Sequence, residues 1–277
     1  MNKRIKQKFI VSYSGGLGSF FAAKRLVEQH GKDKVAAVFA DTKTEDEDLY
    51  RFLDESIAYL GIELFTIEDG RDVWQVFEDV RFLGNSRIDP CSRILKRDLI
   101  RKWQEQNLDN DYHVIALGID WLEIHRFERV KARALQEKKV WIYCAPLCEK
   151  PFINKQQRQQ TLQEIQIEEP RLYKHGFPHN NCGGFCVKAG QAQFARLLEV
   201  FPERYKYHEQ KEQDLQKLLN KPVTILTRVT KGKKRPLSLR QFREELQQQA
   251  FLFDKHDWGG CGCAIDESKE EDDEQED

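Results

Sequence analysis

The feature that most constrains the fold is a glycine- and serine-rich turn near the amino end of the chain. Before it, residues 8–13 are apolar and read as a short buried strand. After it, residues 20–30 have the apolar spacing of a helix, which Gly31 would end as a C-cap. The turn itself, from Ser14 to Ser19, reads SGGLGS and suits neither element. A strand, a turn and a helix in this order predict the first unit of an α/β fold.

The alternation of strands and helices continues over the first 150 residues. Further strands are expected at residues 35–40, 62–67, 112–117 and 140–145, and helices at residues 45–60, 73–82 and 93–106. Parallel strands need helical crossovers, and strands covered on both faces are apolar throughout. We therefore expect residues 1–150 to form a doubly wound α/β domain with a five-stranded parallel sheet.

After residue 150 the pattern changes to helices and cysteine-bearing loops. Helices are expected at residues 155–166, 188–198, 203–219 and 239–249, with one short strand at residues 223–227. These features predict a helical, cysteine-bearing subdomain over residues 151–265. Residues 266–277 hold nine acidic residues and one basic residue, which is typical of a disordered acidic tail.

Without the acidic tail, the rest of the chain (the body) has a basic net charge. The chain has 45 Lys and Arg against 46 Asp and Glu, but without the tail 44 basic and 37 acidic residues remain. Residues 228–235 form a cationic segment, and Arg240 and Arg243 follow it on a predicted helix. A basic body suits a polyanion such as a nucleic acid or a nucleotide phosphate, and a plain solvated surface is the alternative. The tail could also cover the cationic segment in cis.

Composition excludes two broad classes of protein. Hydrophobic residues make up 40% of the chain and charged residues 33%, which is too apolar for a disordered chain and too charged for a membrane protein. No signal peptide is evident, and the seven cysteines are an odd number. We therefore expect a cytoplasmic protein without a membrane partner, whose cysteines serve metal binding or thiol chemistry rather than disulfides.

The turn after the first strand is a candidate phosphate site. A helix N-terminus offers unpaired N–H groups and a positive dipole end, and glycines let a phosphate approach the backbone closely. The loop has no lysine, so it is not a Walker P-loop, and Phe21 stands where a dinucleotide fingerprint needs glycine. The candidate phosphate-binding residues are Ser14, Gly15, Gly16, Gly18 and Ser19.

The order Ser-Gly-Gly-x-x-Ser from Ser14 to Ser19 resembles the pyrophosphate loop (PP-loop) of the N-type ATP pyrophosphatases. These form the adenine nucleotide α-hydrolase-like superfamily, and within it the chain resembles the PAPS reductase-like family. Members usually carry aspartate where this chain has Gly18. The resemblance implies a PP-loop ATPase fold that binds ATP or PAPS with Mg²⁺.

Further matches in the same order extend the resemblance over about residues 9–190. They are Asp41-Thr42 with Glu45, Cys91-Ser92 through Leu95-Lys96, Gly118 with Glu123 and Arg126, and the stretch from Pro170 to Gly176 before Cys182. Asp120 stands where arginine is frequent. The resemblance implies that Asp41, Thr42, Gly118 and Glu123 bind the nucleotide and that Lys96 and Arg126 act as electrostatic clamps in catalysis.

Two cysteine pairs lie in glycine-rich loops. Cys182 and Cys186 form C-x3-C, and Cys261 and Cys263 form C-x-C. Four thiolates from two loops can hold a tetrahedral zinc ion or an iron–sulfur cluster, and small buried cysteines are the alternative. The spacing does not decide the metal. The resemblance favours a 4Fe–4S cluster over Zn²⁺.

Three further cysteines stand apart from these pairs. Cys91 precedes a basic helix, where positive charge and a helix start favour the thiolate. It is a candidate nucleophile or sulfur carrier, or alternatively a residue that only lines the pocket. Cys144 and Cys148 form a second C-x3-C in an apolar stretch, which favours packing over chemistry.

We expect an enzyme that cleaves ATP at the α-phosphate, releases pyrophosphate and adenylylates a substrate, with sulfur transfer to a nucleic acid or a small molecule as a possible second step. Its partners would be an adenine nucleotide, a tRNA or DNA and a sulfur donor protein. One alternative is a PAPS or APS reductase, although the terminal cysteine motif of that enzyme is missing. Another is a non-catalytic nucleotide- or nucleic-acid-binding module. Neither the acceptor nor the oligomeric state can be read from the sequence.

Overall fold

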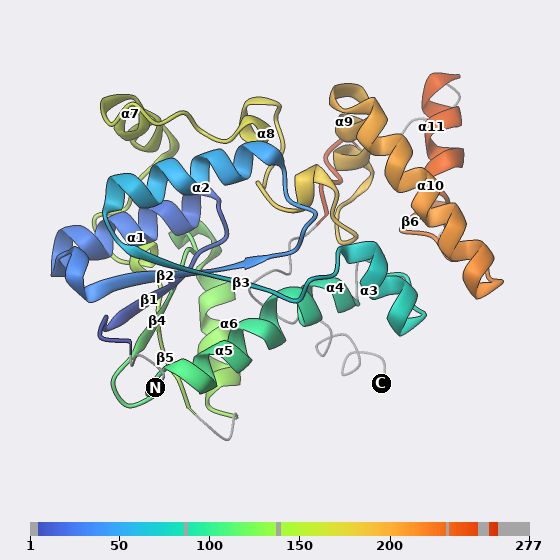
Figure 1. Ribbon diagram of the computed structural model, residues 1–277. Helices are drawn as coiled ribbons and strands as arrows, with labels where there is room; N and C mark the ends of the chain where they lie inside the picture. The colour runs from blue at the N-terminus through green and yellow to red at the C-terminus, as the bar shows by residue number, and fades with distance from the viewer. Residues whose placement is uncertain (1–4, 86–87, 137–139, 231–232, 249–254, 260–277) are drawn as a thin grey trace, which may run out of the picture.

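The computed structural model describes residues 5–85, 88–136, 140–230, 233–248 and 255–259 (Figure 1). Five parallel strands form one sheet in the order β3-β2-β1-β4-β5. They are β1 (Phe9–Ser12), β2 (Val35–Asp41), β3 (Glu63–Glu68), β4 (Val114–Leu117) and β5 (Ile142–Cys144). The predicted doubly wound α/β class is confirmed, with all five strands near their expected positions.

Helices cover both faces of the sheet (Figure 1). On β1, Val11 packs into the core beneath α1 (Leu17–His30) and α2 (Glu47–Leu60). Its neighbour Ile10 packs into the core of the other face, with residues of α5 (Leu99–Asn107) and α6 (Ile124–Ala134). Successive side chains of a strand point to opposite faces. A strand covered on both sides is therefore apolar along its length, as β2 is from Val35 to Ala40, before it ends at the buried Asp41.

Helix α6 was not predicted. Its sequence, IHRFERVKARA, has five charged residues among eleven, and its large apolar residues Ile124, Phe127 and Val130 recur only every third residue. Ile124 is 46% exposed, while Phe127 and Val130 pack against the edge of a core cluster. So narrow an apolar stripe is a weak signal of a buried face.

The remaining helices and strands lie mostly in the second half of the chain. They are η1 (Lys32–Lys34), α3 (Val73–Val80), α4 (Pro90–Ser92), the π-helical η2 (Arg93–Asp98), η3 (Trp121–Glu123), η4 (Pro146–Cys148), α7 (Lys155–Glu164), α8 (Arg171–Lys174), η5 (Cys182–Gly184), α9 (Gln191–Val200), α10 (Pro202–Leu219), β6 (Leu226–Thr230), β7 (Lys233–Leu237) and α11 (Leu239–Gln247). No helix within the described ranges is long and apolar enough to span a membrane. The expected acidic tail, residues 266–277, lies outside the described residues.

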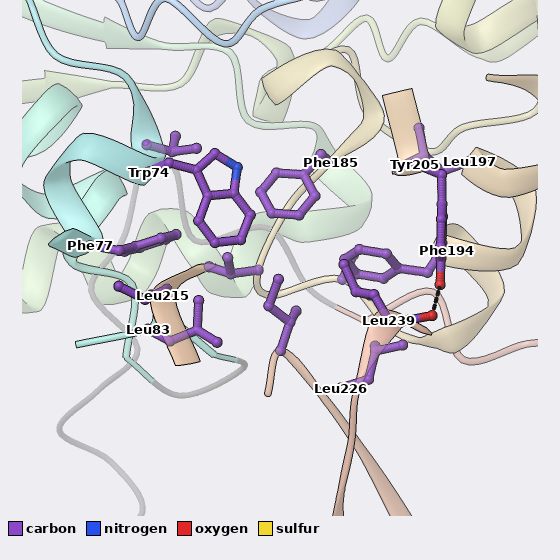
Figure 2. Close-up of a cluster of buried hydrophobic side chains, with 14 of the residues drawn as sticks. Trp74, Phe77, Leu83, Phe185, Phe194, Leu197, Tyr205, Leu215, Leu226 and Leu239 are labelled. Atoms are coloured by element: carbon purple, nitrogen blue, oxygen red, sulfur yellow. Dashed lines mark hydrogen bonds between the residues drawn. The ribbon is translucent and has the colours of Figure 1, made fainter. Parts of the chain in front are cut away.

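One core joins α3 to the helices of the second half (Figure 2). Trp74 and Phe77 of α3 pack with Phe185 and Phe194, and Tyr205 donates a hydrogen bond to the carbonyl of Leu239 at 2.7 Å. Residues on both sides of position 150 therefore share this core. The expected domain boundary at residue 150 stays a prediction.

The prediction of a single strand at residues 223–227 is wrong. Strands β6 and β7 form an antiparallel hairpin, so most of the cationic segment 228–235 lies on a two-stranded ribbon rather than in a loop. The charged residues of β7 are exposed, whereas Leu237 at its end is buried. Apolar periodicity is nearly absent from a strand that is solvated on most of its length, which is why the sequence did not reveal it.

Candidate functional site

A cleft of about 680 Å³ opens at the carboxyl edge of the sheet. Its floor includes the loop after β1 and the residues after β4, and the order of strands reverses between these two strands. Ligands of doubly wound proteins bind at such a reversal point. Helix α7 and residues 173–181 line the cleft as well. The size of the cleft falls within the range of small-molecule and cofactor sites.

The loop after β1 leads directly into the N-terminus of α1. Gly15 has a φ of +72°, and a Cβ atom there would lie 2.6 Å from Cγ of Leu49, so only glycine fits. Gly16 is the N-cap of α1, where no side chain caps the helix and the first turn holds no acidic residue. The first N–H groups and the positive dipole end of this 14-residue helix are therefore left to bind an anion.

The two serines of the loop brace its shape. The hydroxyl of Ser19 donates to the carbonyl of Gly16 at 2.9 Å and accepts from the backbone N–H of Ser14 at 3.2 Å. Asn180 adds a bond from outside the loop, because its Nδ2 donates to the carbonyl of Gly15 at 2.9 Å. Asn180 is only 2% exposed and was not predicted as a site residue. Nothing in its local sequence signals a contact with a residue 165 positions away.

Gly18 and Gly118 pack backbone against backbone. A Cβ atom on Gly18 would lie 2.4 Å from the carbonyl oxygen of Gly118, and one on Gly118 would lie 2.5 Å from the nitrogen of Ser19. Real Cβ atoms do not approach backbone this closely. The aspartate that the resemblance would place at position 18 is therefore sterically excluded, which gives a physical reason for this departure. Ser14, Gly16, Gly18, Ser19 and Gly118 line the cleft, whereas Gly15 lies behind them.

Lys96 and Glu45 form a buried ion pair beside the loop. Nζ of Lys96 lies 2.9 Å from Oε1 of Glu45, whose side chain is fully buried. The same carboxylate accepts from the hydroxyl of Thr42 at 3.0 Å and from the backbone N–H of Cys182 at 2.5 Å. Glu45 thus holds together the end of β2, the helix of Lys96 and the cysteine segment. The sequence placed Lys96 at the site but gave Glu45 no such role.

The opposite wall carries a second charged group. Nη1 of Arg126 lies 2.5 Å from Oε1 of Glu123, and both residues line the cleft, while their predicted roles toward a nucleotide stay predictions. His179 lines it too, and burial lowers the pKa of its imidazole although Glu123 opposes the shift. The imidazole is therefore neutral at pH 7 and able to accept a proton. In the sequence, His179 is one of two histidines near Cys182, where it was considered only as a possible metal ligand and not as a residue of this cleft.

Further cleft residues were also missed. Arg158 of α7 pairs with Asp120. The hydroxyl of Tyr173 lies close to the phosphate loop, since a Cβ atom added to Gly16 would be 3.0 Å from it. Both residues line the cleft. The sequence matched the stretch around Tyr173 to the family, but nothing in it indicated that this stretch would fold over the phosphate loop.

Asp41 and Thr42 stand at the end of β2 without lining the cleft. Asp41 accepts hydrogen bonds from the hydroxyl of Tyr50 and from the backbone N–H of Lys43, both at 2.8 Å. Burial and this carboxylate raise the pKa of Tyr50. Phe39 and Ala40 line the cleft instead. A direct contact of Asp41 or Thr42 with a nucleotide stays a prediction.

A second, much smaller cavity of about 20 Å³ lies on the other side of Lys96. Cys91, Cys182 and Cys186 line it together, with Lys96 and Lys188. Its volume suits about one water-sized group. The sequence treated Cys91 separately from the C-x3-C pair, so the structure brings together two predictions that had been made apart.

The predicted four-cysteine metal site is only half described, because Cys261 and Cys263 lie outside the described residues. Within the described ranges, no group of three or more His, Cys, Asp or Glu side chains is arranged to hold a metal ion. The ligand set therefore stays a prediction. Burial raises the pKa of Cys144 to about 12, which fits a packing role for that thiol.

Comparison with known proteins gives structural matches only. No family model and no curated protein matches the chain. Among solved structures, the PAPS reductase from Candida auris aligns with 14% identity and a TM-score of 0.41, over 61% of this chain and 78% of the other. The U34-tRNA thiolase NcsA from Methanococcus maripaludis, solved with its 4Fe–4S cluster, aligns with 15% identity and a TM-score of 0.42, over 78% and 74%.

A third match is the NH3-dependent NAD synthetase from Campylobacter jejuni, with 13% identity and a TM-score of 0.38, over 79% of this chain and 86% of the other. The TM-scores of these three alignments are below 0.5, so no residue role is taken from these structures.

Proposed function

We propose that the chain is a PP-loop enzyme that binds ATP, or a closely related adenine nucleotide, in the 680 Å³ cleft and transfers its adenylyl group with release of pyrophosphate. The observation that carries the proposal is the uncapped N-terminus of α1 at the reversal point of the sheet. Backbone donors fixed at the start of a helix bind phosphate without any reorganisation of the chain.

Each part of the cleft has a role in this proposal. The amides from Gly16 to Ser19 hold the β- and γ-phosphates, and Lys96 and Arg126 supply positive charge beside them. Glu45 and Glu123 hold these two cations in place. Mg²⁺, when bound with the nucleotide, would neutralise charge on the phosphates, and carboxylates on the cleft wall offer the oxygen ligands that this ion prefers.

In the first step an oxygen of the acceptor forms a bond to the α-phosphorus, and the bond from that phosphorus to the bridging oxygen breaks. Pyrophosphate leaves with the electron pair, and the neutral imidazole of His179 takes the proton of the attacking group. In the second step a hydrosulfide-type nucleophile forms a carbon–sulfur bond with the acceptor, and AMP leaves with the former acceptor oxygen.

The sulfur step is motivated by the cysteine cavity, which shares Lys96 with the cleft. Cys91, Cys182 and Cys186 are the candidate sulfur-handling residues. Cys182 and Cys186 also provide half of the four-cysteine set proposed for an iron–sulfur cluster or zinc, but no step is assigned to such a group. The acceptor, a tRNA, a DNA or a small molecule, and a sulfur donor protein belong to the same proposal.

The test is pyrophosphate release from Mg-ATP, measured with and without added RNA or DNA. The proposal predicts that one class of acceptor stimulates pyrophosphate release. The rate of release should fall at least 100-fold in Lys96→Met. Lys150→Met, which changes a lysine outside the cleft lining, should keep the wild-type rate. Sulfite formed from PAPS and a thiol donor, without pyrophosphate release from ATP, would assign the reductase activity instead. ATP binding without either product would identify a binding module.

A further inference from the structure

A second groove, of about 430 Å³, lies away from the sheet, between the end of α3 and the hairpin β6–β7. Four of its lining residues are cationic, and none is acidic. The cations are Arg81 after α3, Lys221 after α10, and Lys234 and Arg235 on β7. Residues near position 81 and residues from 221 to 235 therefore contribute charge of one sign to one groove.

Among the described residues these cations have no carboxylate partner, unlike their neighbours. Arg228 pairs with Glu245, and Arg243 binds Glu209 through two nitrogens, so two arginines of the region predicted to be cationic are neutralised. In the part of the chain that the structure describes, no carboxylate lies within 4 Å of the four groove cations. A concave surface lined by one sign of charge focuses its field on an approaching anion.

The described chain ends close to this groove. Gly259 forms a β-bridge with Ala189, and the backbone N–H of Gln191 donates to Oδ2 of Asp257 at 3.1 Å. The side chain of Gln191 then donates to the carbonyl of Thr227 at 2.9 Å, and Thr227 lines the groove. Gln191 thus connects the end of the described chain, through its backbone, with the wall of the groove, through its side chain.

The segment that follows matches the groove in charge and in reach. Residues 260–277 are 18 in number and span up to ~60 Å if extended. The last twelve hold nine acidic residues and one lysine. We propose that the acidic segment 266–277 docks in the groove of Arg81, Lys221, Lys234 and Arg235, where it excludes other polyanions. The proposal does not depend on the nucleotide chemistry of the cleft.

Carbodiimide crosslinking of the full chain, with peptide mapping by mass spectrometry, tests the contact. We expect links from Lys221 and Lys234 to carboxylates of residues 266–277, formed within monomers at 20 mM salt and lost at 500 mM salt because the attraction is screened. Lys32 and Lys34, which are exposed in η1 and do not line the groove, are internal controls. Links to these controls at equal yield, links confined to dimers, or no links at all would overturn the proposal.

Competition for a polyanion is the second test, with heparin as the probe. A full-length variant in which the nine acids become Asn or Gln should bind heparin about tenfold more tightly at 50 mM salt. In the background K221E/R235E that gain should vanish, whereas in K32E/K34E it should persist. An equal gain in both backgrounds would show that the segment acts by net charge alone, which contradicts docking in this groove. All readouts omit nucleotide, so their failure leaves the proposed enzyme activity untouched.

Discussion

The 680 Å³ cleft, proposed to bind the nucleotide, and the cysteine cavity both border Lys96 and are built in opposite ways. The 680 Å³ cleft takes its key features from backbone: the start of α1 and the close approach of Gly18 to Gly118. The 20 Å³ cavity takes its character from side chains, which include three cysteines, two lysines and Asp89. Backbone geometry constrains which shapes of ligand fit, whereas side-chain identity determines what chemistry follows.

The comparison predicts which changes should damage which region. A change that moves the backbone at the loop should destroy nucleotide binding, and a change of thiol identity should leave binding intact. Lys96 is the exception, because it borders both regions.

Lys96→Met should have the largest effect of the four substitutions. It leaves the fully buried carboxylate of Glu45 without its cation, which costs about 3–5 kcal/mol when one partner of a buried pair is removed. We expect lower stability in chemical denaturation and weaker ATP binding. Glu45→Gln/Lys96→Met should recover most of the stability but not the affinity. If the double variant is no more stable than Lys96→Met, the pair is not what the substitution disrupts.

Gly18→Ala should come next. The added Cβ would lie 2.4 Å from the carbonyl of Gly118, and overpacking of this kind costs about 1–3 kcal/mol. Because the strain falls on the phosphate loop, ATP affinity measured by calorimetry should fall about 100-fold. Gly31→Ala is the control for strain outside the cleft: a Cβ there meets nothing within 4 Å, but the φ of +83° is unfavourable for alanine, so stability should fall while ATP affinity is kept. Equal affinity in Gly18→Ala and wild type would mean that the loop does not hold the phosphates.

Acid should weaken the core behind the cysteine cavity. The ring of His208 stacks on that of Phe185 with 3.6 Å between the ring centroids, and Nε1 of Trp74 donates a hydrogen bond to Nδ1 of His208 at 2.9 Å. Burial lowers the pKa of His208 to about 3. Its pKa in the unfolded chain is near 6.5, so this contribution to stability is present above pH 6.5 and is lost as pH falls toward 3. The slope approaches ~1.4 kcal/mol per pH unit.

Denaturation midpoints between pH 7.5 and 4.5 measure this dependence. His208→Gln keeps an acceptor for Trp74 but does not titrate in this range. Its stability should therefore depend less on pH than that of the wild type, and parallel pH profiles of the two proteins would contradict the assignment.

Cys91→Ser should have the smallest effect on binding. The thiol lines only the small cavity, so ATP affinity should stay within twofold of wild type while sulfur incorporation into the acceptor is lost. Cys144→Ser, at a thiol held inert by burial, is the matched control and should retain sulfur incorporation. A tenfold loss of ATP affinity in Cys91→Ser would mean that the two regions are not separate.

Local sequence was enough for one region and not for the other. The loop from Ser14 to Ser19 could be predicted because a strand, glycines and a helix follow each other within a few residues. Tertiary packing alone brings Cys91 next to Cys182, which is 91 positions away in the sequence. The same holds for the hydrogen bond from Asn180 to Gly15, which spans 165 positions. Helix α6 and the hairpin β6–β7 were missed or misread because solvated elements show little apolar periodicity.

The central claim is that main-chain amides at the start of α1 hold the phosphates of an adenine nucleotide. Amide hydrogen exchange of the full chain, with and without saturating Mg-ATP, tests it residue by residue. The account predicts slowed exchange concentrated at residues 14–20, with smaller changes around Gly118 and Asn180. ATP that binds without slowing exchange at residues 14–20, or that does not bind at all, would contradict it.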